Sequence, residues 1–507
     1  MITRIHSAKL HGIKAMDIKV ETTVQSAGIG IHLVGLADAS VKESLLRTIT
    51  ALQATGYHIP GKKIVINLAP ADLHKQGSNY DLPIAVGLIT ASGQRDLPDT
   101  DRWLVVGELG LDGSVRSVPG CPQAVLLAKE SGLKGCIIPK DNAEEVRPFA
   151  DDLPVYAVST LDEAVRVLDG SFGIPTVQET PVPENDRGKE TSYPAWNCLV
   201  GNDAAKRALV IAAAGGHDML IIGPAGSGKS TVARALAEIL PPMTVEERHE
   251  TALVYAAAGR RYDIAPGKRP FCAPHYAASL AALLGGGAGE NVLPGEVSLA
   301  HNGVLFLDEY TQMPKSVKES LRGPIEDKKI IISRLKSRIE YPAAFQLVLA
   351  SNPCPCGHYG DGDRCTCTSE QRAAYLSRLS GPVTDHVTIQ MWLDPVKTTA
   401  GESGPTLSEA RQAVINARKR QEERYQGTGI RTNDALTAKD IEKYIKPSDE
   451  VKDIIERLFN HLGLSARSYT RILKIARTIA DIDGADEIAT THVCEAATFR
   501  FLDRKPF

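Results

Sequence analysis

The stretch Gly223-Pro-Ala-Gly-Ser-Gly-Lys-Ser230 decides the fold class, because it matches the pattern G-x-x-x-x-G-K-[ST] of phosphate-binding loops. An apolar run at Met219–Ile222 comes before it and predicts a strand, and helical spacing follows over residues 231–240. Such a loop would place bound phosphates at the N-terminus of the helix. The sequence therefore predicts an α/β core that binds a nucleotide.

Each residue type in this loop has an expected role. Glycines let backbone N–H groups curl around phosphate oxygens, Lys229 would reach the β and γ phosphates of ATP, and the Ser230 hydroxyl would bind Mg²⁺. We expect nucleotide contacts from the whole stretch, namely Gly223, Pro224, Ala225, Gly226, Ser227, Gly228, Lys229, Ser230 and Thr231.

Two later apolar runs end in polar residues that suit ATP hydrolysis. Gly303-Val-Leu-Phe-Leu-Asp308-Glu309 is typical of a strand that ends in two acids. Asp308 would hold Mg²⁺ and Glu309 would polarise the attacking water. The run over residues 345–351 ends at Asn352, whose amide could orient that water near the γ-phosphate. The three segments together predict an ATPase rather than a passive glycine-rich turn.

Length and composition set the remaining bounds. A chain of 507 residues is too long for one hydrophobic core and predicts about three domains of ~100–200 residues each. A net charge of −3 provides no global basic field, so contact with nucleic acid would need a local patch or an assembled pore. We find no signal-peptide pattern and no run of apolar residues that could span a membrane, which predicts a cytoplasmic protein.

Four of the nine cysteines gather in one segment, Cys354-Pro-Cys356 followed by Cys365-Thr-Cys367. Four thiolates could close a tetrahedral zinc site, although the C-x-C spacing is tighter than usual and His358 could replace one ligand. Free surface thiols are the alternative. The odd total in a large chain argues against a framework of disulfides.

Composition shifts divide the chain into four parts. Residues 1–170 mix strand and helix patterns and predict an α+β domain. Residues 171–193 are rich in Pro, Glu and Asp and predict a mobile linker. The ATPase core would cover residues 194–393, with the Cys-rich insertion at 354–367, and helical patterns dominate from 394 to 507 after a hinge-like start. Within the last part, the basic stretch 411–424 could touch nucleic acid, but its interleaved glutamates favour an exposed helix.

Several longer strings resemble the ComM/YifB family of magnesium-chelatase-like AAA+ ATPases. The strings are Ala212-Ala-Ala-Gly-Gly-His217, Arg269-Pro-Phe-Cys-Ala-Pro-His275, Leu284-Gly-Gly-Gly287, the run from Pro294-Gly-Glu-Val to Asp308-Glu309, Asn352-Pro-Cys-Pro-Cys-Gly357 and Ala476-Arg-Thr-Ile-Ala-Asp481. The resemblance implies a hexameric ring, an N-terminal domain like that of Lon protease and a C-terminal helical lid. It also implies action on DNA, by promoting branch migration during recombination.

Some positions depart from what the resemblance implies. Pro122 stands where the Lon protease domain carries its catalytic lysine, and the segment around Ser78 lacks the protease's serine pattern, so we expect no protease activity. His386 replaces the family's usual arginine after Ser-Gly-Pro, and Arg378 is one candidate to serve instead. In the lid, the resemblance makes Arg467 the residue that would sense the γ-phosphate.

These observations leave three functional hypotheses. The first is a ring-shaped motor that remodels DNA, and the second is a chelatase-like ATPase that remodels a partner protein. The third is a nucleotide-gated scaffold with little turnover, which the His386 substitution makes worth testing. The Gly-rich loop at 285–289 could face a ring pore, but it contains no aromatic or basic residue that would bind a DNA strand.

Overall fold

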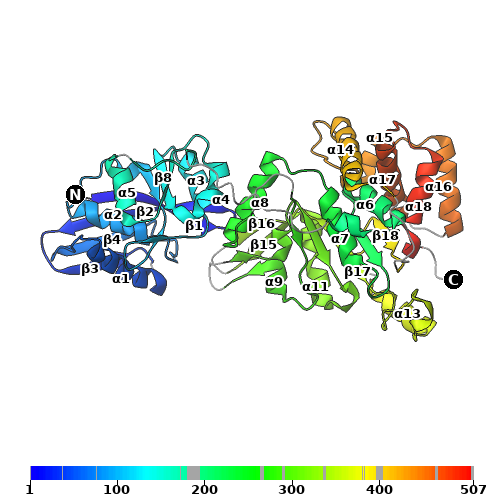
Figure 1. The fold of residues 1–507 in the computed structure, drawn as a ribbon, viewed down its shortest axis with the longest axis horizontal. Helices are drawn as coiled ribbons and strands as arrows, with labels where there is room; N and C mark the ends of the chain where they lie inside the picture. Colours follow the sequence, from blue (N-terminus) through cyan, green and yellow to red (C-terminus); the bar gives the residue numbers. More distant parts are fainter. Residues whose placement is uncertain are drawn as a thin grey trace.

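The computed structural model describes residues 2–36, 38–75, 77–171, 173–179, 194–262, 268–287, 292–334, 338–379, 381, 383–395, 404–462 and 466–503. Figure 1 shows an elongated molecule, with the N-terminal sheet at one end, the nucleotide-binding core in the middle and the C-terminal helices at the other end. Among these residues, no helix is long and apolar enough to cross a lipid bilayer.

The N-terminal part is built on one mixed sheet of seven strands in the order β3-β4-β2-β1-β5-β8-β9. The strands are β1 (Ile2–His11), β2 (Lys14–Gln25), β3 (Gly30–Val34), β4 (Lys63–Ala69), β5 (Trp103–Val105), β8 (Gly135–Pro139) and β9 (Val155–Val158). Its main helices are α1 (Ala39–Ala54), α2 (Asp81–Ala91), α3 (Cys121–Glu130), α4 (Ala143–Val146) and α5 (Leu161–Asp169), beside a small ribbon of β6 (Glu108–Leu109) and β7 (Val115–Arg116). This confirms the predicted α+β character.

The nucleotide-binding core contains a five-stranded parallel sheet in the order β11-β14-β17-β10-β18. The strands are β10 (Met219–Ile222), β11 (Phe271–Cys272), β14 (Val304–Leu307), β17 (Gln346–Ser351) and β18 (Ile389–Trp392). The strands β10, β14 and β17 are buried along their whole length, as expected for a parallel sheet covered on both faces. Because their carboxyl ends share one edge, the residues that follow them meet there.

Helices and short hairpins surround this sheet. They are α6 (Asp203–Gly215), α7 (Lys229–Ile239), α8 (Val245–Ala257), α9 (Leu280–Leu284), α10 (Glu296–Leu299), α11 (Lys315–Ser320), α12 (Arg322–Asp327) and α13 (Ser369–Leu376), with the pairs β12 (Gly285–Gly286) and β13 (Leu293–Pro294), and β15 (Lys329–Ser333) and β16 (Arg338–Pro342). The pair of β15 and β16 projects from the core toward the N-terminal part (Figure 1).

The C-terminal part is helical, as predicted. It comprises α14 (Leu407–Arg424), α15 (Ala438–Tyr444), α16 (Asp449–Leu462), α17 (Ala466–Ile482) and α18 (Thr490–Thr498). One hydrophobic cluster joins Ile211 of α6 and Val232 of α7 to Val414 of α14 and Ile475 of α17. The helical lid therefore shares a core with the ATPase sheet.

The basic helix α14 is exposed over much of its surface, as the charge pattern favours, but two of its arginines are bound to neighbouring helices. Both Nε and Nη2 of Arg418 donate to the carbonyl of Ala213 in α6, at 3.0 and 2.7 Å. Arg424 forms an ion pair with the buried Asp481 of α17. These two cations fasten the lid to its neighbours, and the prediction of a solvated face was wrong for them.

The start of the predicted linker packs against the N-terminal sheet. Val177 is 1% exposed, and its N–H donates to the carbonyl of Val155 in β9 at 2.7 Å. Gln178 donates to the carbonyls of Ala150 and Leu153. Residues up to 179 therefore belong to the N-terminal part. Residues 180–193 of the predicted linker, 396–403 of the predicted hinge and 288–291 of the Gly-rich loop lie outside the described residues.

The N-terminal part contacts the core mainly through α8. Gln123 of α3 donates to the carbonyl of Leu253 at 2.8 Å, and the rings of Phe149 and His249 lie 4.8 Å apart. Ala252 of α8 joins the hydrophobic cluster of the N-terminal part. A second contact is apolar and places Leu10 against the β16 side chains of Ile339 and Tyr341.

Candidate nucleotide-binding site

The phosphate-binding loop connects β10 to α7, as the sequence predicts. Gly226 and Gly228 have φ angles of 78° and 92°, in the left-handed region that glycine tolerates best. A Cβ atom on Gly223 would lie 2.5 Å from the carbonyl oxygen of Leu393, so this position has no room for a side chain. Helix α7 begins at Lys229, and its first N–H groups border the loop.

Lys229 links the loop to the end of the neighbouring strand. Its amino group donates to the carbonyls of Gly223 and Pro224, both at 2.9 Å, and to Oδ1 of Asn352 at 3.0 Å. Burial lowers the pKa of Lys229, and the nearby carboxylates of Asp308 and Glu309 oppose this shift. The sequence predicts both Lys229 and Asn352 as site residues, and the structure brings them into contact.

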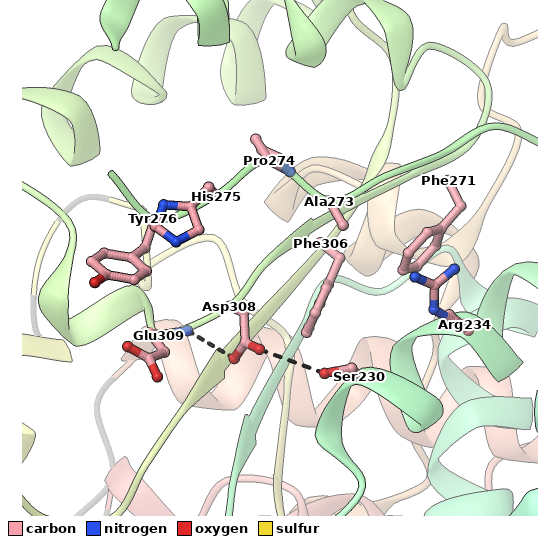
Figure 2. Close-up of a pocket in the computed structure, with 10 residues that line it drawn as sticks. All are labelled: Ser230, Arg234, Phe271, Ala273, Pro274, His275, Tyr276, Phe306, Asp308 and Glu309. Carbon is pink, nitrogen blue, oxygen red and sulfur yellow. Dashed lines mark hydrogen bonds between the residues drawn. The ribbon is translucent and has the colours of Figure 1, made fainter. Parts of the chain in front are cut away.

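Ser230 and Asp308 approach each other from α7 and from the end of β14. The Ser230 hydroxyl lies 3.5 Å from Oδ2 of Asp308 (Figure 2). Mg²⁺ prefers oxygen ligands at ~2.0–2.1 Å, so one ion between these two oxygens could bind both. The donor chemistry and the spacing therefore fit the magnesium site predicted for this pair.

Glu309 has an unusual backbone conformation. Its φ of 47° and ψ of 40° place it in the left-handed region, which is uncommon for a residue other than glycine and often marks a functional site. Its N–H donates to Oδ1 of Asp308 at 2.8 Å, and Figure 2 shows its carboxylate beside that of Asp308. The turn thus directs both predicted acids toward the same space.

A cavity of about 350 Å³ opens beside these acids. It is lined by Ser230, Arg234, Phe271, Ala273, Pro274, His275, Tyr276, Phe306, Asp308 and Glu309 (Figure 2). The size is within the usual range for small-molecule sites. The guanidinium of Arg234 lies 4.9 Å from the centre of the Phe271 ring, where a cation–π contact stabilises it. Arg234 is not part of the predicted site, although its position four residues after Ser230 places both on one face of α7.

Arg467, predicted as the lid sensor, forms an ion pair with Asp385 at 2.7 Å. Its side chain is 73% exposed in this arrangement, so the structure places it at the surface of the lid. The nearby His386 pairs with Glu326 at 3.3 Å, and the guanidinium of Arg378 lies 5.9 Å from the Tyr375 ring. The structure therefore does not bring Arg467 together with Lys229 and Asn352.

The four clustered cysteines converge, as a metal site requires. Their sulfur atoms all lie within 4.8 Å of one another. A tetrahedral zinc site takes four thiolates, so the set fits the predicted ion without His358 as a ligand.

Among the residues that the structure describes, the hydrogen-bond partner of the Ser78 side chain is a carboxylate and not a lysine. The Ser78 hydroxyl donates to the carboxylate of Glu108. Pro122 is buried in the first turn of α3, and Gln123, which follows it, contacts α8. A serine nucleophile needs an adjacent base of suitable pKa, and a carboxylate without a histidine or lysine does not match the Ser–Lys arrangement.

Family models match three consecutive segments of the chain. The models describe "Subunit ChlI of Mg-chelatase" over residues 20–142, "Magnesium chelatase, subunit ChlI" over 196–400 and "Magnesium chelatase, subunit ChlI C-terminal" over 405–500. The boundaries at 196 and 405 lie close to the start of the core and of the C-terminal helices, whereas 20 and 142 lie within the N-terminal part.

Similarity to individual proteins extends over nearly the whole chain. The YifB protein of Escherichia coli is 40% identical over 508 residues, which cover 99% of this chain and 97% of that protein. The competence protein ComM of Haemophilus influenzae is 40% identical over 509 residues, with the same coverage. Lon protease 2 of Bacillus subtilis is 25% identical over 180 residues, or 33% of this chain and 32% of that protein. The chain therefore belongs to the ComM/YifB family of magnesium-chelatase-like AAA+ ATPases.

Proposed function

We propose that this protein hydrolyses ATP with Mg²⁺ in a hexameric cytoplasmic ring and uses the energy to remodel DNA. The convergence of Lys229, Ser230, Asp308 and Asn352 at the ends of three parallel strands supports the ATPase part of this proposal most directly. Ligands bind at this edge of open parallel sheets.

Each residue would contribute a distinct step. Lys229 is held by two backbone carbonyls and would hold the β and γ phosphates through charge-assisted hydrogen bonds. Mg²⁺ bound by Ser230 and Asp308 would neutralise charge that develops on the phosphates. Glu309 would orient the attacking water and accept its proton, and the Asn352 amide would help to position that water near the γ-phosphate.

The choice of DNA as the substrate rests on separate support. One relative is named a competence protein, and competence is the uptake of DNA, which supports DNA as the substrate. The chain carries a net charge of −3, so an assembled ring would have to gather its basic residues around the strand. Remodelling of a partner protein is the second candidate, supported by the match to magnesium chelatase subunits.

The test is steady-state ATP hydrolysis without DNA, with single-stranded DNA and with branched DNA. We expect stimulation by DNA in the unaltered chain. Loss of a charge-assisted contact of ~1.5–3 kcal/mol should weaken ATP binding about 10- to 150-fold in Lys229→Ala. The matched control is Lys315→Ala, because that side chain is 90% exposed.

Each outcome distinguishes the hypotheses. Stimulation by DNA that Lys229→Ala abolishes would support the DNA motor. ATP binding without hydrolysis under any DNA condition would contradict an autonomous motor. A search for hydrolysis in the presence of candidate partner proteins would then separate the chelatase-like ATPase from the nucleotide-gated scaffold. We expect no peptidase activity in any of these assays.

A further inference from the structure

The Cys-rich loop, residues 354–367, packs against the phosphate-binding loop. The N–H of Ala225 donates to the carbonyl of Gly357 at 2.9 Å. A Cβ atom on Gly357 would lie 3.6 Å from that of Ala225, and one on Gly360 would lie 3.8 Å from Pro224. The Cys-rich loop therefore contacts the first half of the phosphate-binding loop directly.

The same loop begins two residues after Asn352, which holds Lys229. Asn352 accepts from the Lys229 amino group at 3.0 Å, and Cys354 is only two positions later in the chain. Cys354 is itself 0% exposed. A change in the conformation of the Cys-rich loop would thus act on the phosphate-binding loop at two points, Ala225 and Lys229.

Few residues of this loop are buried. Of its residues, Cys354 and Gly357 are buried, and all the others are half-buried or exposed. Its regular structure is one short turn at Gly362–Arg364. Small segments without a hydrophobic core usually need a disulfide or a metal to fix them.

The sulfur geometry favours a metal. The distances from Cys354 to Cys356 and Cys365 are 3.4 and 3.8 Å, and Cys356 lies 3.7 Å from Cys365. Four thiolates at ~2.3 Å from one zinc ion in a tetrahedron are about 3.8 Å apart. A disulfide would need ~2.05 Å.

We propose that Cys354, Cys356, Cys365 and Cys367 hold one zinc-class divalent ion, and that nucleotide affinity depends on it because the ion keeps Gly357 against Ala225. The inference rests on the nucleotide binding proposed above. Binding of the ion releases the thiol protons to solvent, and no electron transfer is involved.

The first experiment measures metal content and nucleotide affinity in the full chain, purified under reducing conditions. We expect one zinc ion per chain, and a cobalt-substituted protein with the absorption of tetrahedral thiolate coordination. Cys365→Ser should lose the ion and bind a fluorescent ADP analogue about tenfold more weakly, as expected when an anchoring contact is lost. The matched controls are Cys198→Ser and Cys494→Ser, since these cysteines are exposed and lie outside the cluster.

A second measurement keeps the proposal testable if Cys365→Ser does not fold. A thiol-reactive mercurial and a chelator first remove zinc from the unaltered chain. Excess thiol then releases the mercurial from the cysteines, and zinc is added back. ADP affinity should fall on removal and recover on restoration.

Two results would overturn the inference. One is a chain that takes up no ion, either with its four thiols reduced or because two of the four cysteines form a disulfide that resists the reductant. The other is a chain whose ADP affinity is unchanged when the ion is removed. Lys229→Ala separates the two proposals, because it should lose the nucleotide and keep the ion. An unaltered chain that holds zinc but binds no nucleotide would refute both the proposed ATPase and the dependence of affinity on the ion, and would leave the metal site standing.

Discussion

Asp481 offers the sharpest test of how the lid is held together. Its carboxylate is 1% exposed and accepts from Arg424, from Nε and Nη2 of Arg477 at 3.1 and 2.9 Å, and from Nδ2 of Asn433 at 2.9 Å. Asp481→Asn keeps the size of the side chain but leaves two guanidinium groups without their anion. It also turns an NH₂ group toward these donors.

Removal of one partner from a buried ion pair usually costs about 3–5 kcal/mol, so we expect the free energy of opening of α14 and α17 to fall by that amount in Asp481→Asn. Native-state hydrogen exchange of these two helices measures that free energy, because slow amides report local opening. Asp486→Asn is the matched control. Asp486 is 97% exposed and pairs with Arg420 at 3.3 Å, so its loss should leave exchange unchanged. A fall below about 1 kcal/mol in Asp481→Asn would refute the reasoning.

Three other predictions concern the strand that carries the acids. Nδ1 of His301 accepts a backbone N–H at 3.1 Å, and burial lowers the pKa of His301 below its value in the unfolded chain. The neutral ring therefore contributes fully to the free energy of unfolding above pH ~6.5. This contribution is lost as the pH falls, by up to about 1.4 kcal/mol at pH 5.5. Urea unfolding at pH 7.5 and 5.5 should show that His301→Asn lacks this part of the pH dependence, and an identical dependence in both proteins would contradict it. Gly303→Ala would put a Cβ atom 2.1 Å from the Pro270 carbonyl and should destabilise the chain by at least about 1–3 kcal/mol in thermal unfolding, whereas Gly323→Ala, with no atom within 4 Å, should be neutral or stabilising. Glu309→Gln should retain ATP binding and lose about 10²–10⁴-fold in hydrolysis, and a variant that still turns over normally would exclude Glu309 as the base.

Structural features that depend only on a short stretch of sequence could be predicted best. The strand Met219–Ile222 has the predicted bounds, because a short apolar run between a helix and a glycine-rich loop leaves little choice. Asp308 and Asn352 were predicted as site residues because polar groups after buried strands are exposed at one edge of a parallel sheet. The order of strands in the sheet, which places Asn352 beside Lys229, could not be predicted from the sequence of β10 or of β17.

Tertiary contacts explain what the sequence could not predict. The glutamates interleaved among the basic residues of α14 are typical of a solvated helix, and nothing local shows that Arg418 meets a carbonyl of α6. Val177 lies in a Pro- and Thr-containing segment whose few apolar residues show no regular spacing, so no periodicity predicts its pairing with β9. Arg467 was predicted from a resemblance to a family, and whether it moves from Asp385 to a bound nucleotide stays a prediction.

The contact of α8 with the N-terminal part has a mechanical consequence. Helix α7 starts at Lys229, five residues separate its end from the start of α8, and α8 in turn touches Phe149 and Gln123. The N-terminal sheet extends away from this junction to the far end of the molecule (Figure 1). A small tilt of α7 on nucleotide exchange would therefore sweep that sheet through a larger arc, so the N-terminal part would act as a lever arm on the nucleotide-binding core.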